Sequence, residues 1–375
     1  MNFCDLREIF SPLLDKINKA KPVITIVAGT NGKGETSFNL QRIALQSREK
    51  KRIALWTSPH VQSYNERFSF DGKNLDEDKL ECSLQFFESL YPNNSCRLSF
   101  YELSFWLFCH QVILNKSNFI ILEVGLGGRL DAVNLFDANQ VILTSISRDH
   151  TEYLGSFYHQ IVREKLGVLR EKSKLLFSVR TKYIEKLVLQ EAKKLKVQQI
   201  NRIAPEGKYI DYRIRNWELA KESYESLTKE KVSIHFEEDF TSLGRGNDIL
   251  IEGIKFKFYN SHNLDAHREF LQRFANQHSS VLILFFSKRP IIEIKSILKL
   301  YSRFYKNKIL VGGIEDHFKI LSILELKKMG ICHNDFVDFS DLRLAILKLK
   351  DLGIVNYIVT GTNYIQSMIE DFKVV

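Results

Sequence analysis

The sequence has few of the residues and runs that build disulfide-linked or membrane-spanning proteins. Its five cysteines are scattered, odd in number and form no CxxC pair, so neither a disulfide framework nor a zinc site is expected. No apolar run approaches the length that crosses a bilayer. The first ten residues carry Asp5, Arg7 and Glu8, unlike the apolar stretch of a signal peptide. These absences predict a cytoplasmic protein that does not act at a membrane.

Charge of both signs is present, with a net excess of +9. Such an excess can attract polyanions, but a lysine-rich solvated surface is the simpler interpretation. No basic segment is interleaved with aromatic residues as in a nucleic-acid groove, so no nucleic-acid partner is expected. The length of 375 residues favours two domains, each with its own core.

Short apolar, β-branched runs alternate with helical patterns, which is typical of parallel βα units. In the first half of the chain the predicted strands cover 23–28, 53–56, 119–124 and 141–146. Each is followed at once by polar or glycine-rich sequence. Because ligands of open α/β sheets bind beyond the carboxyl ends of the strands, four segments far apart in sequence can converge on one site.

A second series of predicted strands covers 255–259, 281–286, 308–311 and 357–360, and helical stretches over 265–276 and 291–305 separate them. The stretch 172–247 is more charged and weakly periodic, with a predicted helix over 217–229. Gly244, Gly246 and Asn247 break the pattern and mark a boundary. The sequence therefore predicts two α/β domains, 1–247 and 248–375.

The first predicted strand runs into the sequence GTNGKG and then into a helical pattern over 36–46. Glycines let backbone N–H groups approach phosphate closely, and a helix N-terminus adds a favourable dipole. Lys33 would balance phosphate charge, although no glycine lies five residues before Gly32 as in the common Walker loop. A tight strand–helix connection is the alternative. The order of strand, loop and helix favours a nucleotide-binding loop made of Gly29, Thr30, Asn31, Gly32, Lys33 and Gly34.

This loop and four later segments resemble the folylpolyglutamate synthase and dihydrofolate synthase family of the Mur ligase superfamily. The later segments are TSPH at 57–60 with Glu66-Arg67, EVGLGGRLDA at 123–132 with Asn134, Asp149-His150 with Leu154-Gly155, and REK at 163–165 with Gly167. The resemblance is dense over 23–170 and thin afterwards. It implies an N-terminal P-loop-type ATPase domain with a parallel sheet and a smaller, C-terminal Rossmann-like α/β domain.

Ser58, Glu123 and His150 follow three of the predicted strands, and their counterparts in the family ligate magnesium. Mg²⁺ prefers oxygen ligands and often bridges to nucleotide phosphates. Alternatively they are a turn serine, a helix-capping glutamate and a core histidine. The resemblance also implies that Lys165 is carbamylated, helps to hold a second Mg²⁺ and acts in catalysis with Lys33, His150 and Arg245. An exposed helical lysine paired with Glu164 or Glu171 is the alternative for Lys165.

The second domain of family members closes over the nucleotide. Asn216 fits an asparagine that contacts ATP, and Arg245 resembles an interdomain arginine that reaches phosphate. Such an arginine can stabilise charge during phosphoryl transfer. His262 and Asn263 match part of a family motif for the nucleotide.

Four features depart from the family pattern. Tyr259 stands in place of an aspartate that contacts nucleotide, and Leu264 in place of a proline. Glu35 replaces a serine or threonine beside the phosphates, where repulsion at 4 Å is about 4 kcal/mol per charge pair at an effective dielectric of 20. Either Glu35 points away, or a metal offsets it, or nucleotide binding is weakened. The stretch before the loop is short, which puts the usual N-terminal pterin-binding loop in doubt.

The segment around Phe100 fits a family segment that touches the pterin. An aromatic pair beside a carboxylate suits stacking on a pterin and accepting its amino hydrogens. A core helix stripe that includes Phe105 and Trp106 is an equally good interpretation. The expected substrate-binding residues are Ser99, Phe100, Tyr101, Glu102, Leu130, Asp131 and Ala132.

The resemblance implies a monomeric, ATP- and Mg²⁺-dependent ligase that adds L-glutamate to a folate through an acyl phosphate. Tetrahydrofolate would be the acceptor, and dihydropteroate a further one. Glu35 and Tyr259 keep a second hypothesis open, a nucleotide- and folate-binding relative without turnover. A third is an amide ligase of the same superfamily that acts on another acid.

Overall fold

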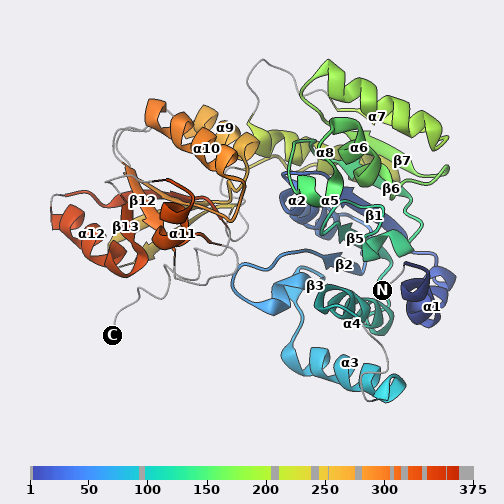
Figure 1. Cartoon of the computed structure of the whole chain (residues 1–375). Coiled ribbons are helices and arrows are strands. Elements are labelled where there is room, and N and C mark those ends of the chain that lie inside the picture. The colour runs from blue at the N-terminus through green and yellow to red at the C-terminus, as the bar shows by residue number, and fades with distance from the viewer. Residues whose placement is uncertain are drawn as a thin grey trace. The chain divides into compact units, whose positions relative to one another are not determined.

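The computed structural model describes the backbone of residues 3–92, 98–203, 211–237, 245–251, 253–274, 281–304, 308–313, 320–331, 336–351 and 353–362. The chain divides into two compact units, Met1–Phe236 and Glu237–Val375, each with its own sheet (Figure 1). The boundary expected after residue 247 stays a prediction. Among the described helices, none combines the length and apolar character needed to pass through a bilayer.

The first unit is built on a sheet whose central strands are parallel and whose β3 and β4 are antiparallel. In spatial order the strands are β4 (Lys73–Asn74), β3 (Phe68–Phe70), β2 (Ile53–Trp56), β5 (Phe119–Glu123), β1 (Val23–Ala28), β6 (Gln140–Leu143), β7 (Lys174–Phe177) and β8 (Gln199–Arg202). The carboxyl ends of β2, β5, β1 and β6 therefore lie next to one another, as the sequence predicts for a single site.

Helices cover both faces of this sheet. They are α1 (Phe3–Lys19), α2 (Lys33–Leu45), α3 (Glu77–Leu90), α4 (Phe100–Leu114), α5 (Thr151–Leu154), α6 (Tyr158–Leu166), α7 (Lys182–Lys194) and α8 (Tyr212–Thr228), with the 3-10 turns η1 (Tyr64–Arg67) and η3 (Ala132–Leu135). Phe10 of α1 and Phe105 of α4 pack with Ile26 and Trp56 in one buried cluster. Helices α2 and α8 pack against each other, α2 also packs against β1, β2 and β5, and α8 against β6 and β7. Burial on both faces explains the continuous apolar strands.

The strands predicted over 23–28 and 53–56 are confirmed as β1 and β2. The strand predicted over 141–146 ends early, at Leu143. The Thr144 N–H still donates to the Ala28 carbonyl of β1, and beyond this bond the hydroxyls of Thr144 and Ser145 donate to the Asn31 carbonyl in the loop after β1. Strands β3, β4, β7 and β8 were not predicted; β3 and β4 are very short, and β8 lies at the edge of the sheet.

The second unit has its own sheet, parallel except for β9. In spatial order its strands are β13 (Phe336–Asp338), β12 (Lys308–Gly312), β11 (Val281–Phe285), β14 (Asn356–Thr360), β10 (Ile254–Tyr259) and β9 (Arg245–Ile251). Its helices are α9 (Leu264–Phe274), α10 (Ile291–Phe304), α11 (Ile323–Lys328) and α12 (Phe339–Asp351). The predicted fold class, α/β with two sheets, is confirmed.

Consecutive side chains of β11 point to opposite faces of this sheet and belong to different hydrophobic clusters. Ile283 lies in the cluster with Leu342 of α12, and Leu284 lies in the cluster with Phe270 of α9. The sheet is thus buried on both faces, which is the arrangement of a Rossmann-like domain. The interpretation of Gly246 and Asn247 as a break is wrong, because both belong to β9, which pairs with β10.

Candidate functional site

The loop after β1 has a backbone that requires glycine at two positions. Gly29 has φ of 148° and Gly32 has φ of 87°, in the region that L side chains rarely adopt. A Cβ on Gly29 would collide with the Thr144 hydroxyl. Gly32 is the N-cap of α2 and gives the first N–H groups of the helix no side-chain cap, and a helix N-terminus of this kind suits phosphate.

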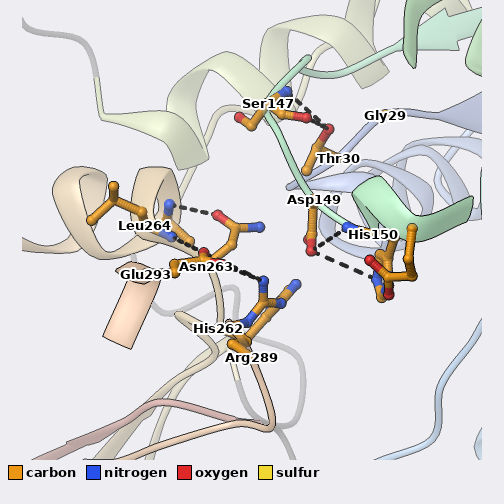
Figure 2. A network of polar contacts seen from close by, with 12 residues as sticks. Gly29, Thr30, Ser147, Asp149, His150, His262, Asn263, Leu264, Arg289 and Glu293 are labelled. Atoms are coloured by element: carbon orange, nitrogen blue, oxygen red, sulfur yellow. Dashed lines mark hydrogen bonds and ion pairs between the residues drawn. The ribbon is translucent and has the colours of Figure 1, made fainter. Parts of the chain in front are cut away.

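The loop is fastened to the segment after β6, more than a hundred residues away. The Thr30 N–H donates to the Ser145 carbonyl at 2.9 Å, and the Asn31 N–H donates to Ser145 Oγ at 2.9 Å. The Ser147 N–H donates to Thr30 Oγ1 at 3.0 Å, as drawn in Figure 2. These bonds fix the loop before any ligand binds, which lowers the entropy lost on binding.

Two lysines meet at this loop. Lys33 Nζ donates to the Thr30 carbonyl at 3.2 Å, and Lys165 Nζ, from α6, donates to the Gly29 carbonyl at 2.8 Å. Lys165 is 4% exposed, so the interpretation of an exposed, solvated lysine is wrong. Burial and then the positive charge of Lys33 lower the pKa of Lys165 to about 7, against an opposing effect of Asp149. A large fraction of the Lys165 amine is therefore neutral near pH 7.

Ser58 and Glu123 lie at the ends of the paired strands β2 and β5. The Ser58 N–H donates to Glu123 Oε2 at 3.1 Å, and both residues are buried. Glu123 is the last residue of β5, and its carboxylate accepts a backbone N–H in the turn after β2. The structure therefore brings together a carboxylate and a hydroxyl, two oxygen donors of the kind that Mg²⁺ prefers.

His150 stands at the start of α5 with φ of 49°, and its side chain is 46% exposed. It is therefore not a core histidine. Its N–H donates to Asp149 Oδ1 at 3.0 Å, and its Nε2 lies 3.8 Å from the same oxygen (Figure 2). Asp149 is buried and was not assigned a role from the sequence. Its place in the Asp149-His150 motif is the signal that could have found it.

Within the described residues no group of three or more His, Cys, Asp or Glu side chains is gathered as a ready metal cluster. The expected set contains only Glu123 and His150 of those residue types, together with Ser58 and Lys165. The magnesium assignment of these four residues stays a prediction.

Ser99 and Glu102 form a capping box at the start of α4. The Ser99 N–H donates to Glu102 Oε2 at 2.7 Å, and the Glu102 N–H donates to Ser99 Oγ at 3.3 Å. Both side chains thus satisfy backbone donors of the helix. This local role is sufficient to explain the two residues, and their expected contact with substrate stays a prediction.

Asp131 organises the loop over 125–133. Its Oδ2 accepts the N–H groups of Gly125 at 2.9 Å and Leu126 at 3.0 Å, and its Oδ1 accepts the Tyr101 hydroxyl at 2.9 Å and the Val133 N–H at 3.1 Å. Burial raises the pKa of Asp131 in spite of these four donors. Because the carboxylate is engaged four times by the protein, its main role in this structure is to hold the loop.

The exposed residues of this region are the ones available to a ligand. Phe100 is 62% exposed and Leu130 is 63% exposed, whereas Ala132 is buried. The Arg67 guanidinium lies over the Phe100 ring at 5.6 Å, and Tyr64 lies 5.3 Å from the same ring. Of the proposed core stripe, Phe105 and Trp106 are buried and Phe100 is not, so the core interpretation holds for the first two, and the contact of Phe100 with a substrate stays a prediction.

Glu35 does not stand as an unpaired charge beside the phosphate-loop backbone. Its Oε1 lies 3.2 Å from Nε of Arg213, and its Oε2 accepts Nδ2 of Asn216 at 2.7 Å. All three side chains are buried between α2 and α8. Asn216, expected near the nucleotide, is thereby placed against the loop, because a Cβ built on Gly32 would be 2.7 Å from Asn216 Oδ1.

In the second unit, Asn263 and His262 follow β10. The buried Asn263 Oδ1 accepts the Ala266 N–H at 2.9 Å at the start of α9, and His262 Nδ1 lies 3.1 Å from Asn260 Oδ1. The Leu264 N–H donates to Glu293 Oε1 at 3.0 Å, as Figure 2 shows. Asn263 therefore serves at least to cap α9.

Tyr259 and Arg245, also in the second unit, bear on the predicted nucleotide contacts. Tyr259 is buried and packs edge-on against Phe270, so it fills core space where the family pattern has an aspartate. The side chain of Arg245 lies outside the described residues. The nucleotide-binding roles expected for Arg245, His262 and Asn263 stay predictions.

No protein-family model matches the chain. Curated relatives match up to about half of its length. A dihydrofolate synthase/folylpolyglutamate synthase of Haemophilus influenzae is 35% identical over 189 residues, 50% of this chain and 41% of that protein. Its Escherichia coli namesake is 39% identical over 158 residues, 41% of this chain and 36% of that protein. The matched segment thus spans less than half the length of these curated relatives.

Solved structures match along the whole chain. The ligand-free bifunctional folylpolyglutamate synthase/dihydrofolate synthase of Yersinia pestis has a TM-score of 0.79 at 22% identity, covering 99% of this chain and 94% of that one. The folylpolyglutamate synthase of Thermotoga maritima has a TM-score of 0.74 at 18% identity, covering 98% and 93%. The resemblance inferred from the motifs is confirmed, and the two-unit fold is that of these proteins.

Proposed function

We propose that the chain is an ATP-dependent carboxylate–amine ligase that adds L-glutamate to a folate, with dihydropteroate as a further acceptor. The observation that carries this proposal is the meeting of Lys33 and Lys165 at the fixed loop after β1. The curated relatives support the reaction by their names. A Yersinia pestis relative is described with AMPPNP and Mn ion, and an Escherichia coli one with DHPP and ADP.

The chain's own residues divide the work at the nucleotide. Backbone N–H groups of the loop and Lys33 would hold the β- and γ-phosphates, and Asn216, Arg245, His262 and Asn263 would contact the nucleotide. Ser58, Glu123 and His150 would hold Mg²⁺, which neutralises phosphate charge when bound. The buried Glu123 beside the Ser58 N–H fits such an oxygen-rich site.

The reaction then needs two substitutions. The folate carboxylate attacks the γ-phosphorus, which forms an acyl phosphate and releases ADP. The amino group of glutamate attacks the acyl carbon, phosphate leaves, and the surplus proton goes to solvent. No enzyme nucleophile is required, so positioning and charge stabilisation by the loop, Lys33 and Arg245 lower the barrier.

Lys165 suits carbamylation chemically. A neutral amine can attack CO₂ and lose one proton to give a carbamate, and a pKa of about 7 supplies that neutral amine at physiological pH. The carbamate would replace a buried cation by an anion able to help hold a second metal ion. The carbamate nitrogen keeps one N–H, the number that the present bond from Nζ to the Gly29 carbonyl needs.

A second candidate is a ligase of the same chemistry with a different acid. It is favoured by the engagement of Ser99, Glu102 and Asp131 in contacts within the protein. Exposed Phe100 and Leu130 would still bind an aromatic acid. Glu35 no longer supports the hypothesis of a binding protein without turnover, because Arg213 compensates its charge. We place the enzyme in the cytoplasm and expect a monomer.

The test is product formation by purified protein with Mg-ATP, glutamate and tetrahydrofolate. Mass spectrometry should find one added glutamate, and phosphate release should need all three substrates. Lys33→Ala should reduce turnover by about 10²-fold or more, as loss of a charge-stabilising group does. Phosphate release without amide product across a panel of acids would refute the proposal, and product from an acid other than a folate would select the second candidate.

A further inference from the structure

Glu35 occupies the third residue of α2, in the first turn after the phosphate loop. Its carboxylate is buried and directed to α8, where Arg213 and Asn216 lie in the first two turns. Arg213 also stacks on Phe236, with its guanidinium 5.3 Å from the ring centroid, and its N–H is bonded to the cap residue Asp211. The charge of Glu35 is therefore compensated by a side chain that is itself held in place.

Asn216 connects Glu35 to the phosphate loop. A Cβ on Gly32 would lie 2.7 Å from Asn216 Oδ1 and 2.8 Å from Nδ2, so the amide lies directly against the glycine. A carboxylate only accepts hydrogen bonds, so Glu35 binds the NH₂ side of the amide and fixes its orientation. The three side chains thus connect the start of α8 to the left-handed residue at the start of α2.

We propose that Glu35 is a positioning residue for the phosphate loop. With Arg213 it fastens α8 to the first turn of α2, and through Asn216 it holds Gly32 in the conformation that directs the loop N–H groups at phosphate. Glu35 thereby orders the phosphate loop at a position where a carboxylate without a compensating cation would repel the phosphates. The nucleotide part of this inference rests on the proposed function, whereas the ordering of the loop does not.

The double variant Glu35→Ser with Arg213→Met tests this directly, because it removes both charges together and leaves neither buried alone. The first readout is hydrogen exchange, without nucleotide, at the Thr36 amide, which donates to the Gly32 carbonyl at 3.0 Å. We expect about tenfold faster exchange, since the first turn opens more often. The second readout is the Kd for ADP with Mg²⁺, which should rise about tenfold when the loop is in its binding conformation a tenth of the time.

Ser223→Ala is the matched control. Ser223 is buried in the same helix, and its hydroxyl is bonded to Gln140 rather than to the loop. The control should leave Thr36 exchange and the ADP Kd unchanged. Asn216→Ala keeps the ion pair but removes the contact with Gly32, so it should accelerate Thr36 exchange as the double variant does, and it replaces the double variant if that one does not fold. Its Kd for ADP is left out of the comparison, because Asn216 would itself contact the nucleotide.

Wild-type exchange at Thr36 in the double variant or in Asn216→Ala would overturn the inference, as would equal acceleration in the control. Failure of the wild-type protein to bind ADP would instead refute the proposed function. In that case the exchange measurement alone still decides whether Glu35 orders the loop.

Discussion

At the scale of single residues, Lys165 combines burial with a neighbouring positive charge at the candidate site. Its ammonium is buried beside Lys33, and its pKa falls from 10.5 to about 7. In the unfolded chain the group keeps its ordinary pKa, so the unfolded state binds more protons between about pH 7 and 10.5. Stability should therefore rise with pH across that window, because folding there requires a proton to be lost.

This leads to a prediction about Lys165→Met. At pH 7 the variant should be more stable than the wild type by about 4 kcal/mol, since it no longer buries an ammonium group. At pH 10 the difference should shrink to about 1 kcal/mol or less. Urea unfolding at both pH values measures it. A wild type that is as stable as the variant at pH 7 would show that the lysine is not desolvated.

The sequence could place Lys165 near the site only through its family segment. Its contact with the Gly29 carbonyl joins residues 136 positions apart, and no spacing rule predicts such a contact. Glu35 shows the same limit. Its neighbour in sequence is the loop, but the groups that compensate it come from α8, which the sequence located only approximately.

At the scale of elements, substitutions at the start of α4 can distinguish a helix-capping role from a substrate-binding role. Ser99→Ala should lower the free energy of unfolding by about 1 kcal/mol, the usual loss for a serine cap. If the capping box is the role of Ser99, the KM for the folate acceptor should stay at its wild-type value. Denaturant unfolding and steady-state kinetics on the same preparation measure both quantities.

Phe100→Ala is the comparison variant for this prediction. The ring is mostly exposed and lies under Arg67, so its loss should barely change stability and should raise the KM for the acceptor. The opposite pattern, in which Ser99→Ala raises KM and Phe100→Ala does not, would return Ser99 to the substrate site.

Elements were predictable where one physical signal dominated. The apolar runs of β1 and β2 are buried on both faces, so their bounds follow from the sequence alone. Strand β6 ends at Leu143, short of the predicted bound, because its apolar run gives way to Thr144 and Ser145, whose hydroxyls donate to the Asn31 carbonyl. The edge strand β9 was missed, because its glycine suggested a break and its pairing with β10 is a tertiary effect.

At the scale of the whole molecule, the second unit has an acid-sensitive core. His267 is buried with its Nδ1 2.8 Å from the Tyr301 hydroxyl. Burial, and then the charges of His262 and Arg289, lower its pKa from 6.5 to about 3. The unfolded histidine takes up a proton below about pH 6.5 and the folded one does not. The contribution of the neutral His267 to the free energy of unfolding is therefore fully present above that pH. It is lost as the pH drops from 6.5 towards 3, by up to about 1.4 kcal/mol per pH unit.

The two units can be followed separately in an acid titration, because all three tryptophans, Trp56, Trp106 and Trp217, lie in the first. We expect far-UV circular dichroism to change at a higher pH than tryptophan fluorescence. His267→Gln should move the circular dichroism transition to lower pH, since glutamine can bond Tyr301 without titrating. Coincident transitions that the substitution does not shift would exclude this histidine as the cause.

The central claim is that the loop of Gly29 to Gly34 serves the activation of a carboxylate by ATP. The most direct measurement uses tetrahydrofolate labelled with ¹⁸O in its glutamate carboxylates, incubated with the protein, Mg-ATP and glutamate. An acyl phosphate hands one carboxylate oxygen to phosphorus, so each phosphate released should carry one ¹⁸O atom. Phosphate released without the label would mean that water attacks ATP, and the ligase account would then be wrong.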